Sequence, residues 1–589
     1  MRVMEPETKN CQNCQKDFLI ESEDLNFYEK MKIPAPTFCA ECRFQKRLMF
    51  RNDRTLYKRK CDLTGKDMVT FFAPDKNVKV YFNKDWWGDA WEAKDFGQDY
   101  DPSKNFFEQF NELQKKTPWP NLIVDSTNIN CDYANNTSAS KNCYLVFDAS
   151  RCENVYYSEI IANSRDSMDC TTLNKGELCY DVVDGNGSKI KYSENCDECL
   201  DTWFSKDCVG CSNCFGCVNL RKKSYCIWNQ QYTKEEYSAK LESFGLDKYS
   251  VIEDFKKRSR KFWLKFPRKY YHGRQNTNSS GDYVYYSKNA KNIYQSVYVE
   301  DSKNCQFMLA PSAKDCYDIS GWGENIELCC DGISVGNNSQ NIKFCFLASR
   351  EANNVEYSMM VPGCQDCFGC CNLKKGQYCI LNKQYSKEEY FVLREKIIKD
   401  MNERPYVDKL GRVWRYGDFF PYDLSLFDYN ESSAFPFFRL SKEEAVEKGF
   451  KWNDRSATKY EPTIKSEDLP ETVGDMPDSI LEEILECTEC KKAYRITRGE
   501  LTLLRKMNIP IPRKCFMCRF YERIGRINPN KLYSRQCQCA GEKSENGEYQ
   551  NTISHSHGAG RCDTEVETSY APDRPEIVYC ENCYKQEVY

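Results

Sequence analysis

The chain has 589 residues, a length that predicts several domains rather than one. Its formal net charge is −4, so no global electrostatic field draws it to DNA or membranes. The sequence contains no apolar run long enough to span a membrane and no signal-peptide-like start, and we therefore expect a cytoplasmic protein. Thiols stay reduced there, so the 36 cysteines predict metal ligation and small buried side chains rather than disulfides.

Two C-x-x-C motifs lie near the N-terminus, and the same unit recurs near the C-terminus at a constant offset. The likeness extends past the cysteines, for example from Arg43 to Arg519. Two such motifs joined by a modest loop can place four thiolates tetrahedrally around zinc. The first structural zinc site is predicted at Cys11, Cys14, Cys39 and Cys42, and the second at Cys487, Cys490, Cys515 and Cys518.

A third zinc site is predicted at Cys537, Cys562, Cys580 and Cys583, although Cys539, His555 and His557 are further ligands that leave its assignment open. Residues 61–124 look like a damaged copy of this last module. Phe82 and Asp85 stand there in the places of Cys580 and Cys583. We expect Trp86, Trp87 and Trp91 to replace the metal by apolar packing, which gives three structural zinc ions per chain rather than four.

From about residue 125 onward, short units recur in which an asparagine or aspartate precedes a cysteine, valine or isoleucine. Asn142-Cys143, Asn154-Val155 and Asn304-Cys305 are examples. Asparagine and aspartate tolerate positive φ at a turn, and the residue that follows would stack in an inward ladder. We expect two units, about 22 residues, to form one coil of a parallel β-solenoid.

The solenoid is itself duplicated, because Cys211–Leu220 is echoed by Cys364–Leu373. Each copy leads to a capping-box sequence, Thr233 with Glu236 and Ser386 with Glu389, so a helix should close each half. The predicted fold class is mainly β: a tandem duplicated β-solenoid (parallel β-helix-like) flanked by small zinc-ribbon modules of four cysteines each, with short capping helices.

The predicted domain organisation follows the chain. It consists of a zinc-ribbon module (1–60), a degenerate zinc-module-like segment plus helix (61–124), the first solenoid half with its capping helix (125–245), a basic aromatic linker (246–275), the second solenoid half with its capping helix (276–400), an aromatic-rich linker region (401–480), a zinc-ribbon module (481–536) and a second C-terminal zinc module (537–589).

Two basic stretches interleave cations with aromatic residues, a pattern typical of nucleic-acid binding. One follows Cys42, and the other lies in the linker between the solenoid halves. The alternative is a solvated helix in each case, with Phe44 or Trp263 on the packed side. The candidate nucleic-acid contacts are Arg43, Lys46, Arg47, Lys257, Arg258, Lys261, Trp263 and Arg268.

Two catalytic alternatives remain open. Cys208, Cys211, Cys214 and Cys217 resemble an iron–sulfur motif, but the last gap is short and the proline typical of ferredoxins is absent. A carbohydrate-active solenoid enzyme would need paired carboxylates, for which Asp166, Asp169, Asp181 and Asp184 are candidates.

Each terminal C-x-x-C module resembles the "probable zinc-ribbon" domain of many bacterial proteins, which implies a metal-held fold without catalysis. Over nearly its full length the chain is similar to a family of cysteine-rich proteins found in candidate-phylum bacteria (Patescibacteria), through motifs such as Trp86-Trp87, Cys214-Phe215-Gly216-Cys217 and Ser569-Tyr570-Ala571-Pro572. This resemblance implies the architecture and a bacterial cytoplasmic setting, and it implies no mechanism.

Together these features predict a non-enzymatic, zinc-stabilised scaffold that docks on a large partner. RNA or a ribonucleoprotein is favoured over protein alone because of the two basic stretches.

Overall fold

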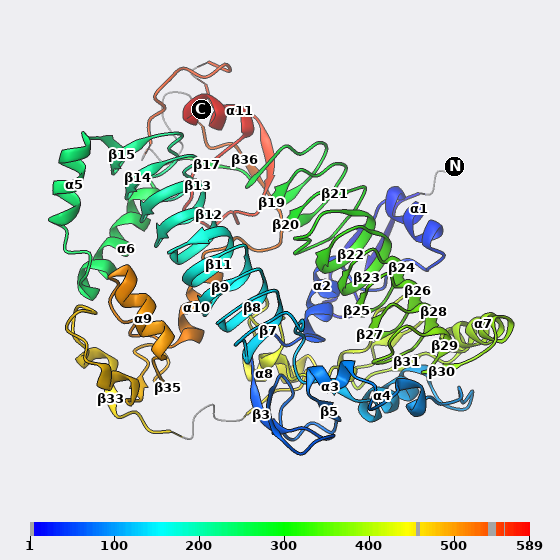
Figure 1. Ribbon diagram of the computed structural model, residues 1–589. Coiled ribbons are helices and arrows are strands. Elements are labelled where there is room, and N and C mark those ends of the chain that lie inside the picture. The colour runs from blue at the N-terminus through cyan, green and yellow to red at the C-terminus, as the bar shows by residue number, and fades with distance from the viewer. Residues whose placement is uncertain (1–4, 455–459, 540–548, 559) are drawn as a thin grey trace. The chain divides into compact units, whose positions relative to one another are not determined.

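The computed structural model describes residues 5–454, 460–539, 549–558 and 560–589 (Figure 1). The chain divides into two compact units. Unit 1 consists of Met1–Leu122, Tyr271–Asn453 and Asn530–Leu532; unit 2 consists of Ile123–Tyr270, Asp454–Pro529 and Tyr533–Tyr589. Unit 1 thus contains the N-terminal cysteine-rich module and the second solenoid half, and unit 2 contains the C-terminal modules and the first half.

The predicted fold class is confirmed, because parallel β-strands stack into a solenoid in each unit (Figure 1). In unit 2 the strands are β7 (Tyr133–Ser138), β8 (Tyr144–Ser150), β9 (Glu153–Tyr156), β10 (Glu159–Ala162), β11 (Arg165–Glu177), β12 (Tyr180–Lys191), β13 (Glu194–Trp203), β14 (Ser212–Phe215) and β15 (Ser224–Ile227). In unit 1 they are β18 (Gly273–Arg274), β19 (Gly281–Tyr285), β20 (Ile293–Val297), β21 (Val299–Glu300), β22 (Ala313–Gly323), β23 (Ile326–Gly336), β24 (Gln340–Lys343), β25 (Phe346–Ser349), β26 (Asn353–Glu356), β27 (Met359–Pro362), β28 (Gln365–Phe368) and β29 (Gln377–Ile380).

One coil of the solenoid is shorter than the predicted length of about 22 residues. Cys170 pairs with Val182, and its backbone N–H donates to the Ser158 hydroxyl, 12 residues back along the chain. Each recurring sequence unit is therefore a whole coil rather than half of one.

The coil is this short because the backbone turns at every third residue. Asn154, Tyr157 and Ile160 have φ of 54°, 51° and 55°, and the residue after each of them is buried. The predicted arrangement, an asparagine or aspartate corner before an inward residue, is found at these sites. The same arrangement, a positive-φ corner before an inward residue, also occurs at corners formed by tyrosine and isoleucine, for which positive φ is uncommon.

The interior is lined by small and medium-sized side chains, and its thiols and hydroxyls bond to the surrounding backbone. Cys152 Sγ donates to the Ser150 carbonyl at 3.4 Å, and Ser158 Oγ donates to the Tyr156 carbonyl at 2.8 Å. Cysteine and serine thus fill equivalent inward positions and satisfy the same kind of acceptor two residues earlier. Among the described residues, none of the cysteines forms a disulfide.

The outer corners are joined by a ladder of side-chain amides. Asn130 donates to Asn142, Asn142 to Asn154, and Asn154 to Asp166, at 3.1, 3.1 and 3.0 Å. Each bond connects one coil to the next. This ladder accounts for the recurrence of asparagine and aspartate at one corner.

Each solenoid ends in a short antiparallel strand, β16 (Gln230–Gln231) or β30 (Lys383–Gln384), followed by the predicted helix. Both capping boxes are formed, with Glu236 N–H donating to Thr233 Oγ1 and Glu389 N–H to Ser386 Oγ, each at 3.2 Å. The helices are α5 (Lys234–Glu242) and α7 (Lys387–Glu403). In unit 2 a further helix, α6 (Tyr249–Trp263), follows.

The terminal modules repeat one order of elements in the two units. Unit 1 has β1 (Glu7–Asn10), β2 (Asp17–Ile20), α1 (Ser22–Met31), α2 (Ala40–Met49), β3 (Tyr57–Lys60), β4 (Asp67–Thr70), β5 (Val80–Tyr81) and α3 (Asn83–Trp87). Unit 2 has β34 (Leu485–Glu486), β35 (Ala493–Tyr494), α9 (Arg498–Met507), α10 (Phe516–Ile524), β36 (Tyr533–Gln536), β37 (Glu565–Thr568), β38 (Val578–Tyr579) and α11 (Glu581–Val588). Unit 1 also contains α4 (Phe106–Lys116) and α8 (Lys442–Glu447).

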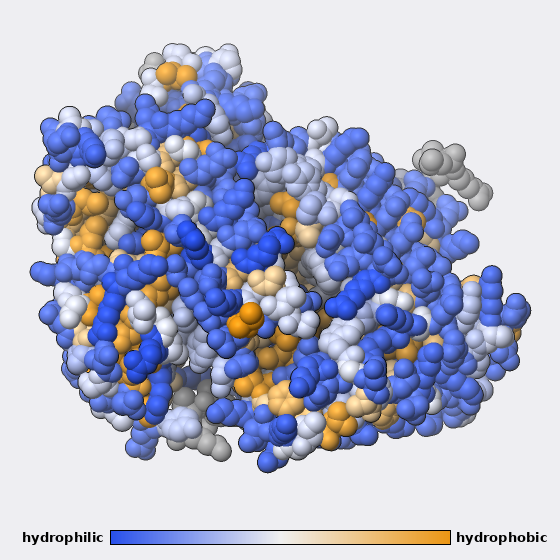
Figure 2. Space-filling view, viewed as in Figure 1, coloured by the Kyte–Doolittle hydropathy of each residue, from blue (hydrophilic) through white to orange (hydrophobic). Residues whose placement is uncertain are grey.

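In the described part of the chain, no helix combines the length and the apolar character needed to cross a membrane. The face of the molecule in Figure 2 is mostly hydrophilic, with apolar residues in scattered groups.

Candidate metal centres

The first C-x-x-C motif of each module is a tight turn at the end of a β-hairpin. Cys11 N–H donates to the Lys16 carbonyl and its own carbonyl accepts from Gln15, whose φ is 59°. Cys487 and Lys491 repeat this turn, with φ of 60° at Lys491. The left-handed residue after the motif lets both thiols of the turn face the same side.

The second C-x-x-C motif opens a helix. Cys39 and Cys515 are the N-cap residues of α2 and α10, so the positive end of the helix dipole faces the thiols. The N–H of each N-cap cysteine also donates to the first thiol of the other motif, Cys39 to Cys11 Sγ at 3.3 Å and Cys515 to Cys487 Sγ at 3.2 Å. Both features favour thiolates, the form that binds metal.

The sulfur spacing fits a tetrahedral metal ion. Zn–S bonds of about 2.3 Å give sulfur–sulfur edges of about 3.8 Å in a regular tetrahedron. The Cys14–Cys39 and Cys490–Cys515 sulfur distances are 3.8 and 3.7 Å. The structure brings together the predicted ligands of each site, Cys11, Cys14, Cys39 and Cys42 in unit 1 and Cys487, Cys490, Cys515 and Cys518 in unit 2, with all sulfurs of a group within 4.8 Å of one another.

The last module of unit 2 holds two groups of ligands rather than one. Cys537, Cys562, Cys580 and Cys583 lie together, as predicted, and Cys562 Sγ is 3.9 Å from Cys580 Sγ. The ligands left over in the sequence form a group of their own: Cys539, His555, His557 and, again, Cys583. The described residues therefore contain four groups that could hold a metal ion, where the sequence predicted three.

The damaged copy in unit 1 contains no such group among its described residues. Its hairpin and helix match β36, β37 and α11 in order, but only Cys61 remains of the cysteines. Trp86 follows the helix start in this copy, is fully buried, donates from its indole to the Pro118 carbonyl at 2.8 Å, and packs on Trp91. This packing is consistent with the prediction that apolar contacts stabilise the copy that lacks the ligands.

The helix with the second motif is joined to its solenoid by buried ion pairs. In unit 1, Arg43 lies 2.9 Å from Asp318, and Arg47 lies 2.9 Å from Asp331 and 3.5 Å from Asp318. Burial disfavours the charged guanidinium, but Asp318 together with neighbouring groups, including Asp331, outweighs it and raises the pKa of Arg43. These arginines anchor α2 to β22 and β23.

Lys46, between the two arginines, is also buried. Its ammonium nitrogen lies 4.5 Å from the centre of the Phe38 ring and 5.0 Å from that of Trp414. Burial lowers the pKa of Lys46. The sequence-based assignment of Arg43, Lys46 and Arg47 to nucleic-acid contacts therefore needs correction, because all three side chains face the interior of unit 1.

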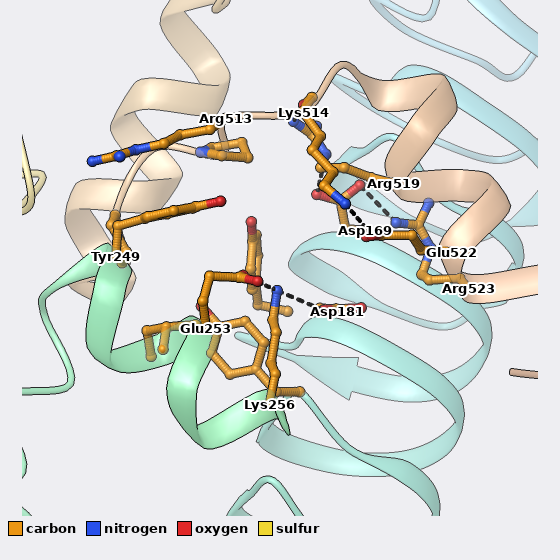
Figure 3. Close-up of a pocket in the computed structure, with 15 residues that line it drawn as sticks. Asp169, Asp181, Tyr249, Glu253, Lys256, Arg513, Lys514, Arg519, Glu522 and Arg523 are labelled. Carbon is orange, nitrogen blue, oxygen red and sulfur yellow. Dashed lines mark hydrogen bonds and ion pairs between the residues drawn. The ribbon is translucent and has the colours of Figure 1, made fainter. Parts of the chain in front are cut away.

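Unit 2 repeats the anchor. Arg519 and Arg523, the counterparts of Arg43 and Arg47, both lie 2.9 Å from Asp169. Arg523 also donates to the Tyr157 carbonyl at 2.9 Å, and Arg519 lies 3.5 Å from Glu500. In Figure 3, Asp169, Arg519 and Arg523 line a pocket that α6 closes on the opposite side.

This pocket is small and its charges are paired. Its volume is about 40 Å³, against several hundred for a typical ligand site. Lys256 reaches from α6 to Glu253 at 2.9 Å and to Asp181 at 3.5 Å (Figure 3). Burial opposes ionisation of Asp181, but Arg526 and Lys256 outweigh it and lower its pKa. A carboxylate with a lowered pKa is a poor general acid.

Helix α6 buries one face and exposes the other. Ile252, Phe255 and Trp263 are buried, and Phe255 packs on Phe215 with ring centres 4.9 Å apart. The alternative reading, a helix that seals the solenoid with its aromatic face, therefore describes this packing. The assignment of Trp263 and Arg268 to nucleic-acid contacts needs correction, because Trp263 is 5% exposed and Arg268 is 2% exposed.

The cations on the opposite face of α6 remain at the surface. Lys257, Arg258 and Lys261 are exposed, as are Arg260 and, in the turn after the helix, Lys265; Arg258 lies 3.4 Å from the exposed Asp254. Three of the eight candidate nucleic-acid residues are thus accessible to a partner.

The residues of the catalytic alternatives have structural contacts. Cys208, Cys211, Cys214 and Cys217 are inward residues whose thiols donate to backbone carbonyls, and they form none of the metal-ligand groups found among the described residues. Asp166 is bound by Lys506 at 2.9 Å. With Asp169 and Asp181 also paired, these three carboxylates are engaged in ion pairs rather than free for catalysis.

Sequence reasoning missed the anchor because a basic run after a C-x-x-C motif looks like a solvent-facing surface. The internal repeat held a usable signal. Arginine recurs at 43 and 519 and at 47 and 523, whereas Lys46 is replaced by Glu522. The arginines are kept in both copies of the repeat, whereas the residue beside them changes from a lysine to a glutamate. This pattern is more consistent with arginines that bind a specific buried acceptor than with a general affinity for phosphate.

Comparison with known proteins adds little to this description. No family model and no curated protein matches the chain. Among the solved structures that match is one of a proposed acetyltransferase from Desulfovibrio desulfuricans G20, with 10% identity, covering 49% of this chain and 74% of that one. Its TM-score is 0.10.

Proposed function

We propose that the protein is a zinc-stabilised, non-enzymatic cytoplasmic scaffold that binds a phosphate-bearing partner, RNA or a ribonucleoprotein, through the exposed face of α6. Zinc is the metal that suits groups of four thiolates or mixed thiolates and imidazoles in tetrahedral spacing. Carboxylate oxygens, which Mg²⁺ and Ca²⁺ prefer, are not among the grouped ligands of the described residues.

The observation that carries the proposal is a group of lysines on and just after α6. Lys257 and Lys261 are spaced by four residues on one side of the helix, Lys265 follows in the turn after it, and all three are exposed. Arg260 adds an exposed cation nearby, while Asp254 is the exposed acid of this face. Such a group matches the regular charge of a phosphate backbone.

The packing of α6 narrows the expected mode of binding. Its aromatic side chains are turned towards the solenoid, with Phe262 5.2 Å from Trp228 between ring centres. Bases would therefore find no aromatic platform on this helix. We expect contacts to phosphates, with little sequence preference and a strong dependence on salt.

The test is the affinity of the purified full chain for a fluorescein-labelled single-stranded RNA of mixed sequence, measured by anisotropy at several salt concentrations. The variant carries Lys257→Gln, Lys261→Gln and Lys265→Gln. If each lysine neutralises one phosphate, the slope of log K against log salt should decrease in magnitude by about 2.

A matched control removes three exposed lysines from other helices, by Lys234→Gln, Lys387→Gln and Lys396→Gln. It has the same net charge as the test variant and should keep nearly wild-type affinity and slope. Equal losses in both variants would mean a general charge effect, and wild-type protein that does not bind RNA would reject the proposal in favour of a protein partner.

A further inference from the structure

We propose that the C-terminal module of unit 2 holds a pair of zinc ions bridged by the Cys583 thiolate. One ion would take Cys537, Cys562 and Cys580 with Cys583, and the other would take Cys539, His555 and His557 with Cys583. This site is separate from α6 and does not depend on the proposed binding of RNA.

The geometry that points to a bridge is that Cys583 belongs to both groups. In each group the ligand atoms of all four residues lie within 4.8 Å of one another. Cys583 is 1% exposed and lies in the first turn of α11, where the N-terminus of the helix favours a thiolate. A thiolate has several lone pairs, so one sulfur can bind two ions.

The second group has the surroundings expected of metal ligands. His555 directs Nδ1 towards Cys539 Sγ, 3.0 Å away, and Nε2 towards Glu587, 3.0 Å away. The side chains of His555 and Glu587 are both fully buried. A metal-binding histidine usually donates its other ring N–H to a carboxylate, which fixes the lone pair on the metal side.

Neighbouring residues hold this carboxylate and the Cys539 sulfur in place. Glu587 accepts hydrogen bonds from the Tyr549 hydroxyl at 2.5 Å and from the Thr552 hydroxyl at 2.7 Å. Asn551 donates to Cys539 Sγ at 3.2 Å and accepts from the Tyr579 hydroxyl at 2.6 Å. These hydrogen bonds orient the buried imidazole and thiol so that Nδ1 of His555 and Sγ of Cys539 can bind the same ion.

The bridge also distinguishes a structural site from a catalytic one. With Cys583 shared, each ion has four protein ligands and no open position, which is typical of structural zinc. Without sharing, the second ion would keep three protein ligands and could bind a water. The proposal therefore assigns the pair a role in holding the C-terminal module together.

Metal content tests the number of ions. Full-length protein loaded with zinc and analysed by mass spectrometry of the metal should contain four zinc ions per chain, and the double variant His555→Gln, His557→Gln should contain three. The third histidine of the chain, His272, lies in unit 1 and supplies the control, because His272→Gln should keep four. Three zinc ions in the wild type would overturn the proposal.

Cobalt substitution tests the bridge, and the deciding signal comes from the wild-type protein, so the outcome does not depend on whether a variant folds. A shared thiolate couples two high-spin Co²⁺ ions antiferromagnetically and suppresses their electron paramagnetic resonance signal. Fully loaded wild type should therefore show the signal of two cobalt ions out of four, and the double variant the signal of three. A wild-type signal from all four would show that Cys583 does not join them.

Discussion

In each unit, one aspartate forms ion pairs with two arginines of the helix that begins at the second C-x-x-C motif. Asp169 pairs with Arg519 and Arg523, and Asp318 pairs with Arg43 and Arg47, with every one of these side chains nearly or fully buried. Removing one partner of a buried pair leaves the other charges without compensation. The two aspartates should therefore be more sensitive to substitution than the many surface carboxylates.

We expect Asp169→Ala and Asp318→Ala each to lower the free energy of unfolding of its unit by about 3–5 kcal/mol. Urea denaturation followed by intrinsic fluorescence measures this loss. Glu177→Ala is the matched control in unit 2, because Glu177 forms an exposed pair with Arg165 at 2.8 Å, and it should change stability little. A loss at Asp169 no larger than that at Glu177 would contradict the anchoring role.

Lys191 in unit 2 makes stability depend on pH. Burial lowers its pKa from 10.5 to about 8, although its ammonium donates to the Met507 carbonyl at 3.1 Å and lies 3.9 Å from the Trp203 ring centre. Between pH 8 and 10.5 the unfolded chain binds the proton more tightly than the folded chain, so this residue makes stability rise with pH in that window.

Lys191→Met should remove this contribution. Relative to the variant, wild type should gain roughly 3 kcal/mol of stability between about pH 7 and about pH 10. Denaturant titrations of both proteins at the two pH values give the difference directly. Lys189→Met, at an exposed position two residues earlier, should show no such change relative to wild type.

Within the solenoid elements, cysteine acts as a small hydrogen-bond donor. Cys211 Sγ donates to the Val209 carbonyl at 3.5 Å, and Ser205 Oγ makes the same bond to the Trp203 carbonyl at 2.9 Å. A serine at 211 can therefore keep the bond and nearly the same volume.

We expect wild type and Cys211→Ser to be equally colourless and to have the same metal content, whereas Cys490→Ser should release one metal ion. Metal analysis and a visible spectrum of anaerobically purified protein compare the two. Brown wild-type protein that bleaches in Cys211→Ser would instead restore the iron–sulfur alternative.

The solenoid class could be predicted from the sequence, but the coil length could not. Asparagine and aspartate mark only some of the corners, such as Asn154 and Asn163, whose amides bond to the next coil. The other corners are occupied by residues such as Tyr157, Ile160 and Leu178, which carry no turn signal, yet their φ values are between 51° and 55°. Neighbouring coils impose this conformation, so tertiary packing, and not local preference, sets the 12-residue period.

The ligand groups show a similar division. The C-x-x-C spacing alone identified the thiols of the first two groups, because both halves of each site lie in short local turns. The second group of the C-terminal module depends on Glu587 and Asn551, which approach His555 and Cys539 only in the folded chain. The spacing of residues in the sequence does not predict these partners.

At the scale of the whole molecule, the grouped ligands belong to the terminal modules, while the solenoid interiors are held by backbone and small side chains. Chelation should therefore act on part of the structure. After treatment with EDTA, α2 and α10 should lose protection from hydrogen exchange, since their first turns carry the ligands, while the central strands of both solenoids keep most of theirs.

Hydrogen exchange followed by mass spectrometry resolves these segments in one experiment. Addition of zinc should restore protection of the two helices. If β11 and β12 lost protection as fully as α10, the solenoid would depend on the metal, contrary to this prediction.

The corner at every third residue gives the solenoid a reading frame. An insertion of three residues adds one side and twelve residues add a whole coil, but a change by one residue turns the inner side chains outward from that point on. One such slip lies at Gly187, where the amide bond from Asn186 to Asp197 spans 11 residues. Gly187 has φ of 137°, and a Cβ there would lie 2.1 Å from the Cys199 carbonyl oxygen, so no side chain fits at this slip. Other coils are longer than 12 residues, as where Cys316 pairs with Cys329. Solenoids of this type can therefore change length during evolution by whole sides, and by single residues where the local backbone restores the phase.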